Sequence, residues 1–406
     1  MTAVEGWVAT GFGPVADVLA HGARATVRDR ERVADLGSGG GAFAAYVDGE
    51  CVVDVWAGWA APGVPWAAET RAVIMSATKG LTTLCAHILH DRDQLDLDAP
   101  VAAYWPEWAA AGKERTTVRQ LLSHQAGAIA VPDADRLLGW DGAGWADGPA
   151  IAAAIAAAPP AWEPGKAHGY HGVTFGWLVG ELVRRISGVS LGTFFRSEVA
   201  ERLGVTCDIG TPASALGNVA RVLEWGDPMS PRHRPPLDPD SLAGRSVLAG
   251  RRGDLFADGE GRPRFASFMN QPAVLTAEMG SINATASARG LARVYSALAV
   301  GEELVSRPSV ARFATEQVCG RDAVMRVPTR WAVGYTRESA SAPGLPRQHG
   351  PDDAAFGHTG AGGQVAMADP EAGVACAFLR NHMERQDMPF LGAAAVDALY
   401  RCLARR

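Results

Sequence analysis

Alternating hydrophobic and polar residues near both ends of the chain predict β-strands. Residues 43–56 alternate around Val47-Asp48-Gly49-Glu50, in which Asp-Gly is typical of the two positive-φ positions of a tight hairpin turn. Near the other end, strands are predicted at residues 330–335, 362–369 and 373–381, with residues 370–372 as the turn between the last two. The pattern therefore predicts an antiparallel sheet built from both ends of the chain.

Helical periodicity dominates the middle of the chain. Hydrophobic residues recur every three or four positions over residues 81–89 and again over residues 175–186. The Ala-rich residues 150–158 also predict a helix, too short to cross a bilayer, and residues 393–403 predict a closing helix on the terminal sheet. Residues 226–266 are rich in Pro, Gly and Arg, so we expect a long irregular segment there, at the border of a pocket.

The length of the chain, 406 residues, exceeds that of a usual compact domain. We expect an α/β subdomain from residues 1–75 and 290–406, in which helices cover the faces of the antiparallel sheet in an α+β sandwich. A mainly helical subdomain, residues 76–289, is expected to be inserted between these two segments. The active site would lie in the cleft between the two subdomains.

Composition and charge narrow the class of partner. A net charge of -6 and a pI of about 5.9 give no basic surface for nucleic acid or anionic membrane, so we expect a small-molecule partner. The N-terminus has no basic start with a long apolar run, and the six cysteines form no CxxC pair, which predicts a cytoplasmic protein with reduced thiols. His87 and His90 lack a nearby third ligand, so we expect no metal and no cofactor.

The first candidate for catalysis is a serine three residues before a lysine. The chain has only three lysines among 38 Lys and Arg residues, and one of them, Lys79, follows Ser76 in MSATKG at the start of a predicted helix. A desolvated lysine can become neutral and accept a proton, whereas arginine stays charged. Residues three apart share a helix face, and the free N–H groups of a first helical turn favour an oxyanion. Ser76 could therefore supply both a nucleophile and an oxyanion donor.

Two further segments could complete such a site. Tyr170 lies in the Gly-rich sequence WEPGKAHGYHG, just before a predicted helix, where its phenol could share a proton with the lysine. The sequence GHTGAGG, residues 357–363, leads into a predicted strand. Its glycines would let a substrate approach the backbone, so that the N–H of Ala361 could be the second oxyanion donor.

The three segments occur in the order of the motifs of a known superfamily. The chain resembles the serine β-lactamase and penicillin-binding-protein superfamily, specifically its class C-like esterase branch, the family VIII carboxylesterases. The matching motifs are Ser76-Ala77-Thr78-Lys79, Tyr170-His171-Gly172 and His358-Thr359-Gly360. The resemblance extends to the flanks QLDLDAPVAAYWPEW (94–108), TVRQLLSHQAG (117–127) and YHGVTFGWLVGELVRRISG (170–188) and covers about residues 71–381.

The resemblance implies a role for each motif residue. Ser76 would be acylated, Lys79 and Tyr170 would share its proton, and the N–H groups of Ser76 and Ala361 would hold the oxyanion. The residues expected to contact the substrate are His358, Thr359, Gly360, His171, Trp331 and Phe356. Gly172 replaces the usual Asn and His358 the usual Lys, and the loss of that lysine's charge favours esters over β-lactams. We therefore expect a serine carboxylesterase.

The same residues leave other functions open. An acyltransferase would use the same acyl-enzyme and would be revealed by products formed with added alcohols or amines. An amidase, D-aminopeptidase, peptidase or weak β-lactamase would also use it. A non-catalytic binding protein or sensor would hold a stable acyl adduct, although all three motifs keep reactive groups. The acyl and alcohol specificity and the oligomeric state also stay open.

Two other serines occur in sequence patterns that resemble those of catalytic serines, but their surroundings in the sequence do not fit that role. Gly188-Val189-Ser190-Leu191-Gly192 matches the nucleophile elbow of α/β-hydrolases but joins two predicted helices, so Ser190 is expected to cap a helix. Ser123 and His124 are adjacent in the sequence, and adjacent side chains rarely face each other, which argues against a catalytic pair.

Overall fold

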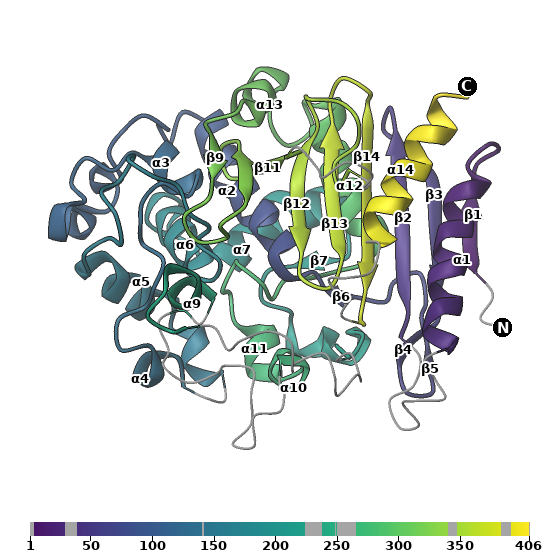
Figure 1. Ribbon diagram of the computed structural model, residues 1–406, viewed down its shortest axis with the longest axis horizontal. Coiled ribbons are helices and arrows are strands. Elements are labelled where there is room, and N and C mark those ends of the chain that lie inside the picture. Colours follow the sequence, from purple (N-terminus) through teal and green to yellow (C-terminus); the bar gives the residue numbers. More distant parts are fainter. Residues whose placement is uncertain are drawn as a thin grey trace.

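The largest element of the computed structural model is a nine-stranded antiparallel sheet (Figure 1). The structure describes residues 4–28, 39–139, 142–223, 238–247, 249, 265–339, 347–382 and 391–405. The strand order is β1-β3-β2-β14-β13-β12-β11-β10-β9. The strands are β1 (Glu5–Val8), β2 (Gly41–Val47), β3 (Glu50–Ala57), β9 (Val318–Arg321), β10 (Pro328–Trp331), β11 (Thr336–Arg337), β12 (Phe356–Gly360), β13 (Gln364–Asp369) and β14 (Val374–Arg380). The predicted antiparallel sheet from both chain ends is confirmed.

The hairpin predicted near the N-terminus is present, but one predicted strand is shorter than expected. Val47 pairs with Glu50, and the turn residues Asp48 and Gly49 have φ of 50° and 85°. The prediction of one strand over residues 330–335 was wrong, because β10 ends at Trp331 and the chain turns back into β11. Gly334, with φ of 84°, makes this turn possible, and a period of two does not reveal it.

The sheet is covered on both faces. Ala42, Ala44 and Tyr46 of β2 enter the core that α12 (Ala288–Val300) covers, whereas Phe43 and Ala45 enter the core on the opposite face. On that second face α1 (Gly13–Arg28) and α14 (Leu391–Leu403) lie side by side, although they come from opposite ends of the chain (Figure 1). The result is an α/β sandwich, as expected.

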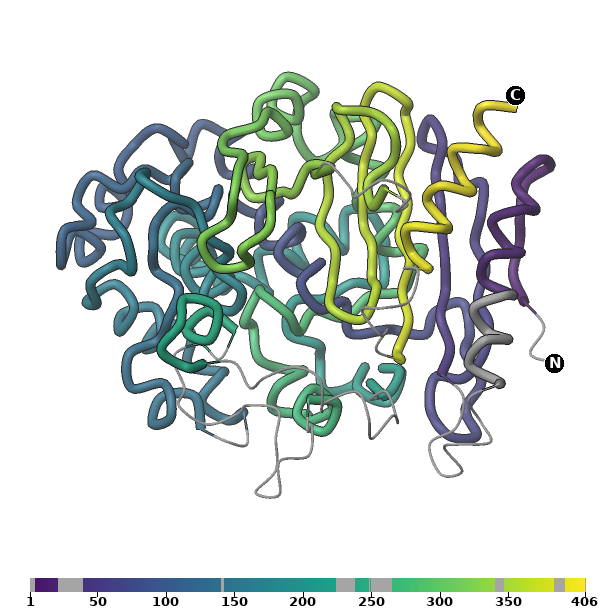
Figure 2. Tube along the Cα trace, in the orientation of Figure 1, coloured from purple at the N-terminus to yellow at the C-terminus, as the bar shows by residue number. Residues whose placement is uncertain are grey.

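Most of the remaining helices lie to one side of the large sheet, in the blue and teal part of the trace in Figure 2. They are α2 (Thr78–Asp91), α3 (Val118–Leu122), α4 (Ala134–Leu138), α5 (Gly148–Ala157), α6 (Thr174–Ser187), α7 (Leu191–Phe195), α8 (Glu201–Leu203), α9 (Leu242–Val247), α10 (Phe265–Met269), α11 (Pro272–Thr276) and α13 (Arg307–Ala314). Short strands also occur at β4 (Trp59–Ala61), β5 (Val64–Pro65), β6 (Ala72–Val73), β7 (Cys207–Asp208) and β8 (Thr285–Ala286). Turns of 3₁₀ helix are η2 (Met75–Ala77), η3 (Val101–Ala103), η4 (Pro106–Gly112), η5 (Ala143–Ala146) and η7 (Ala213–Asn218), and η6 (Arg196–Ala200) is a π-helical turn.

The expected irregular segment, residues 226–266, is only partly described. Within it the structure describes residues 238–247, 249 and 265–266, and a short helix, α9, forms there. The other residues of that prediction lie outside the described parts of the chain. The division into subdomains at residues 75/76 and 289/290 stays a prediction, although the strands of the large sheet fall within residues 5–57 and 318–380.

Helix α2 carries the Ser-x-x-Lys motif and is buried along most of its length, from Thr78 to Leu89. It packs against α6 and α7 on one side and against β12 of the sheet on another. A Cβ on Gly80 would lie 2.0 Å from the Tyr295 hydroxyl oxygen, so only glycine lets this aromatic ring approach the helix so closely. The N-terminus of α2 is thereby fixed where the helices meet the sheet.

Two further features concern the helices and the cysteine thiols. None of the helices in the described part of the chain combines the length and the apolar character needed to cross a membrane. All six cysteines are free, and four of them, Cys85, Cys207, Cys376 and Cys402, are buried.

Candidate active site

Ser76 lies in a tight turn between the short strand β6 and helix α2. The preceding residue, Met75, has φ of 50°, a left-handed conformation that costs a non-glycine residue about 1–3 kcal/mol. Met75 and Ala77 are buried, whereas Ser76 is partly exposed. The sequence places Ser76 in the first helical turn, and the structure has it in the 3₁₀ turn η2, which leads directly into α2. This turn presents the hydroxyl while its neighbours anchor the backbone.

The amine of Lys79 lies beside the Ser76 hydroxyl. Lys79 Nζ is 3.3 Å from Ser76 Oγ and donates a hydrogen bond to the carbonyl of Ser281 at 3.0 Å. The side chain is fully buried, and this burial holds the pKa of Lys79 well below its usual value. Ser281 is itself fixed, since its hydroxyl donates to the carbonyl of Val173 and accepts from the N–H of Gly176. The sequence alone did not reveal Ser281 as a partner of the lysine.

Tyr170 completes the contacts of the serine hydroxyl. Its phenol is close enough to Ser76 to affect the pKa of the phenol, and the centre of its ring lies 4.8 Å from Lys79 Nζ. Burial raises the pKa of Tyr170, which keeps the phenol protonated. The ring stacks on Trp331, with centroids 5.6 Å apart and planes at 10°. The structure therefore brings together the serine, lysine and tyrosine predicted from the first two motifs.

Strand β12 brings the third motif to the same place. A Cβ on Gly360 would lie 2.4 Å from the carbonyl oxygen of Ile74, so the strand touches the turn that carries Ser76. In the described chain β11 pairs with β12 only at Phe356 and Gly357, which leaves residues 358–360 beyond the end of β11. Ala361 follows in an exposed turn, and its N–H stays a predicted oxyanion donor.

His358 faces Tyr170 and Trp331, with ring centroids 6.2 and 6.1 Å away. Its Nδ1 is 2.8 Å from the carbonyl oxygen of Thr359, which can only accept, so Nδ1 carries the proton. Nε2 is then an acceptor, and it is buried without a hydrogen-bond partner among the described residues. Burial, together with the nearby Lys79, lowers the pKa of His358 to about 3. This imidazole is neutral at pH 7.

The structure argues against a substrate contact for two residues predicted to make one. Phe356 is fully buried in the core, where its ring packs on Phe313 and Tyr335. Both ring nitrogens of His171 are occupied by backbone groups, Nδ1 by the carbonyl of Gly169 and Nε2 by the N–H of Ala128. Their side chains have structural roles, because nearness in the sequence does not decide where a side chain points.

The other predicted contact residues differ in their placement. Trp331 is buried and touches the site through its stacking on Tyr170. Thr359 is half-buried, and the alternation of a strand directs its side chain to the opposite face from His358. Gly360 meets the Ser76 turn directly. Contacts of Thr359 and Gly360 with a substrate stay predictions.

The suggestive patterns in the sequence have structural explanations. Ser190 caps α7 by accepting from the N–H of Thr193, between two helices and far from the strand-turn-helix of an elbow. One ring nitrogen of His87 contacts the carbonyl of Val333, and one ring nitrogen of His90 contacts the carbonyl of Leu95. Over the described ranges, His, Cys, Asp and Glu residues form no group of three that could hold a metal ion.

Comparisons with known proteins extend over almost the whole chain. A model of the Beta-lactamase family matches residues 27–400. The chain is 36% identical over 367 residues to the esterase/beta-lactamase LipL of Mycobacterium tuberculosis, covering 85% of this chain and 77% of that protein. A solved family VIII carboxylesterase matches with a TM-score of 0.79 and 32% identity, covering 98% of this chain and 100% of its own. A penicillin-binding protein homologue from Caulobacter crescentus matches with a TM-score of 0.78 and 31% identity, covering 99% and 100%. The resemblance inferred from the three motifs is confirmed, and the chain belongs to the β-lactamase family.

Proposed function

We propose that this protein hydrolyses carboxylic esters of small molecules through an acyl-enzyme on Ser76. The observation that carries the proposal is the fully buried amine of Lys79, whose nitrogen lies 3.3 Å from the Ser76 hydroxyl oxygen. A neutral amine at this distance can take the proton of the hydroxyl as its oxygen attacks the ester carbonyl. The names of the relatives, an esterase/beta-lactamase and a family VIII carboxylesterase, support an ester substrate.

The protonation states assign a direction to each proton transfer. Lys79, with its lowered pKa, accepts the proton of Ser76, while the protonated Tyr170 donates its own to the departing alkoxide. Transfer of a proton from the ammonium to the phenolate then restores both groups. In deacylation the same pair takes a proton from water and returns one to the serine oxygen. Backbone N–H groups of Ser76 and Ala361 would hold the oxyanion in both steps.

The charge of the third motif favours esters over β-lactams. A β-lactam carries a carboxylate, which a lysine at the first position of this motif would attract. Here that position holds His358, which is neutral because burial lowers its pKa to about 3. A neutral ester needs no such cation. The proposed substrates are therefore uncharged near the scissile bond.

The test is hydrolysis of p-nitrophenyl acetate and butyrate by the parent protein, Ser76→Ala and Ser190→Ala, with intact-mass detection of an acyl adduct. Ser190→Ala is a matched control, because this serine caps a helix within a Gly-x-Ser-x-Gly pattern. We expect hydrolysis and adduct to vanish only in Ser76→Ala. Undiminished hydrolysis by Ser76→Ala would show that the nucleophile is another residue.

A further inference from the structure

The backbone on both sides of Tyr170 is held by one residue that the proposed mechanism does not use, His124. The carbonyl of His124 accepts a hydrogen bond from the N–H of Gly169 at 3.0 Å. Its ring nitrogen Nδ1 accepts a second from the N–H of His171 at 3.1 Å. Gly169 and His171 are the two neighbours of Tyr170 in the chain. One residue from a distant segment thus fixes the backbone before and after the phenol.

The ring of His124 also touches the phenol itself. It is fully buried and lies edge-on to Tyr170, with centroids 5.2 Å apart, and edge-on to Trp331 at 4.2 Å. Trp331 in turn stacks on the ring of Tyr170. The phenol is therefore confined by two aromatic neighbours as well as by its own backbone. This is the arrangement that a proton-transferring side chain requires.

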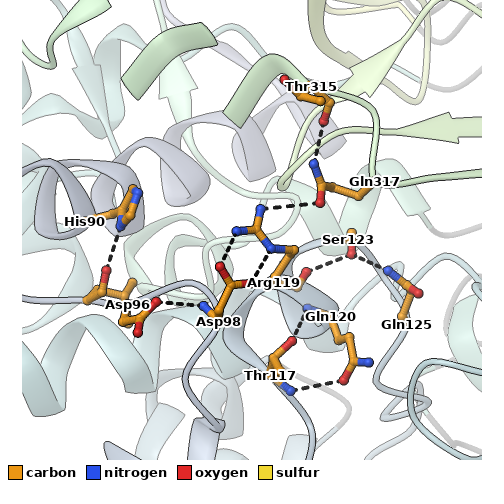
Figure 3. A network of polar contacts seen from close by, with 11 residues as sticks. His90, Asp96, Asp98, Thr117, Arg119, Gln120, Ser123, Gln125, Thr315 and Gln317 are labelled. Carbon is orange, nitrogen blue, oxygen red and sulfur yellow. Dashed lines mark hydrogen bonds and ion pairs between the residues drawn. The ribbon is translucent and has the colours of Figure 1, made fainter. Parts of the chain in front are cut away.

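His124 is itself held in a fixed place. It has φ of 60°, a left-handed conformation that few non-glycine residues adopt and that the surrounding structure must enforce. On one side of it Ser123 donates to the carbonyl of Arg119, and on the other side Gln125 donates to Ser123 (Figure 3). Arg119 in turn forms a two-point ion pair with Asp98. Figure 3 shows these links in one continuous network around α3.

Two further side chains hold the same loop, but only through its backbone. Asp322 Oδ1 accepts from the N–H of Tyr170 at 3.2 Å. Ser246 donates to the carbonyl of Tyr170 at 2.6 Å and accepts from the N–H of Gly172 at 3.0 Å. Of these three residues, His124 alone combines bonds to both neighbours of Tyr170 with contact to the ring.

We propose that His124 is a positioning residue of the acylation step, which sets the place of the Tyr170 phenol by accepting the N–H of His171 at Nδ1. The inference rests on the proposed function, because it assumes that Tyr170 transfers a proton. His124 does not act as a base itself, since its acceptor nitrogen is occupied by that N–H. It acts on the reaction only through Tyr170.

Three variants distinguish the hydrogen bond that His124 accepts at Nδ1 from the effect of its left-handed backbone conformation. His124→Asn and His124→Gly both tolerate a positive φ, but only asparagine offers a side-chain oxygen near the position of Nδ1. Tyr170→Phe removes the phenol that His124 is proposed to position. Steady-state kinetics on ethyl butyrate, whose alkoxide needs a proton to leave, and thermal unfolding are measured for each variant and for His124→Gly combined with Tyr170→Phe.

We expect Tyr170→Phe to lower kcat by about a hundredfold or more. His124→Gly should lower kcat by about tenfold or more with a smaller change in KM, whereas His124→Asn should stay within about threefold of the parent. The double variant should be no slower than Tyr170→Phe, because a residue that acts through the phenol has nothing left to position.

Several outcomes would overturn the inference. It fails if folded His124→Asn and His124→Gly have equal kcat, or if the two losses multiply in the double variant. If His124→Gly does not fold, the test is the kcat of His124→Asn. A folded His124→Asn with a kcat as low as that of Tyr170→Phe would contradict the positioning role of His124. If Tyr170→Phe itself keeps the kcat of the parent, the proposed proton transfer is wrong, which is a different failure from that of His124.

Discussion

Lys79 Nζ lies 3.3 Å from Ser76 Oγ, and the lysine side chain is entirely buried. An amine in this position is a base only while it is neutral, and its burial lowers its pKa accordingly.

Replacing this lysine should remove the base while leaving the fold. We expect Lys79→Met to lower kcat for p-nitrophenyl esters by about a thousandfold, the middle of the range for general-base catalysis. Lys113→Met is the matched control, because Lys113 is also fully buried but donates to the carbonyls of Ala110 and Ala158. Equal losses of kcat in the two folded variants would mean that Lys79 has only a structural role.

The contact between Gly360 and the Ser76 turn predicts a steric effect on catalysis. Gly360→Ala would place a Cβ 2.4 Å from the carbonyl oxygen of Ile74 and 3.0 Å from Met75 Cβ. The strand must then move away from the nucleophile, so we expect a kcat loss of about tenfold or more and a loss of about 1–3 kcal/mol in the free energy of unfolding. Gly217→Ala is the control, since a Cβ there meets nothing within 4 Å. Unchanged kinetics in Gly360→Ala would contradict a tight contact.

The neutral third-motif residue predicts a change in substrate preference. His358→Lys would place a cation where the structure has a neutral imidazole, so we expect faster hydrolysis of a carboxylate-bearing β-lactam such as nitrocefin. His358→Gln, which adds no charge, should leave nitrocefin hydrolysis at the level of the parent. Comparison of kcat/KM for nitrocefin and for p-nitrophenyl butyrate measures the effect. An equal gain from lysine and glutamine would show that charge is not the cause.

Buried neutral histidines predict loss of stability in acid. Burial lowers the pKa of His87 and His358 to about 3 and that of His171 to about 4, against about 6.5 in the unfolded chain. Between these values the unfolded chain binds more protons, so stability is full above pH 6.5 and falls as the pH is lowered toward 3. Each such histidine should cost about 2 kcal/mol at pH 5, because one pKa unit corresponds to about 1.4 kcal/mol.

Urea unfolding from pH 7.5 to 5 measures this loss, and His87→Gln isolates one contribution. His87 touches the carbonyl of Val333 through Nε2, a contact that the glutamine amide can replace. We expect the variant to lose less stability in acid than the parent does. Identical pH dependence of the two proteins would show that His87 titrates normally in the folded state.

The pattern of residues was sufficient for the main elements and for the catalytic candidates. Periodicity predicted α2, α6 and α14, and the Asp48-Gly49 turn predicted its hairpin, because these features depend on neighbours close in the sequence. The order of the three motifs predicted the family, and the structure brings Ser76, Lys79 and Tyr170 together. Chemically reactive residue types at fixed spacing can be read without coordinates.

Only the tertiary structure decided the environment of these groups. The partner of Lys79 is a carbonyl at residue 281, and the backbone beside Tyr170 is held by His124, Ser246 and Asp322, which lie from 46 to 152 positions away. The structure also shows structural contacts for Phe356 and His171, which were predicted to contact the substrate because Phe356 adjoins one motif and His171 lies within another. The charges of Lys79 and His358 follow from desolvation, which depends on every atom that packs around them. No local pattern in the sequence contains that information.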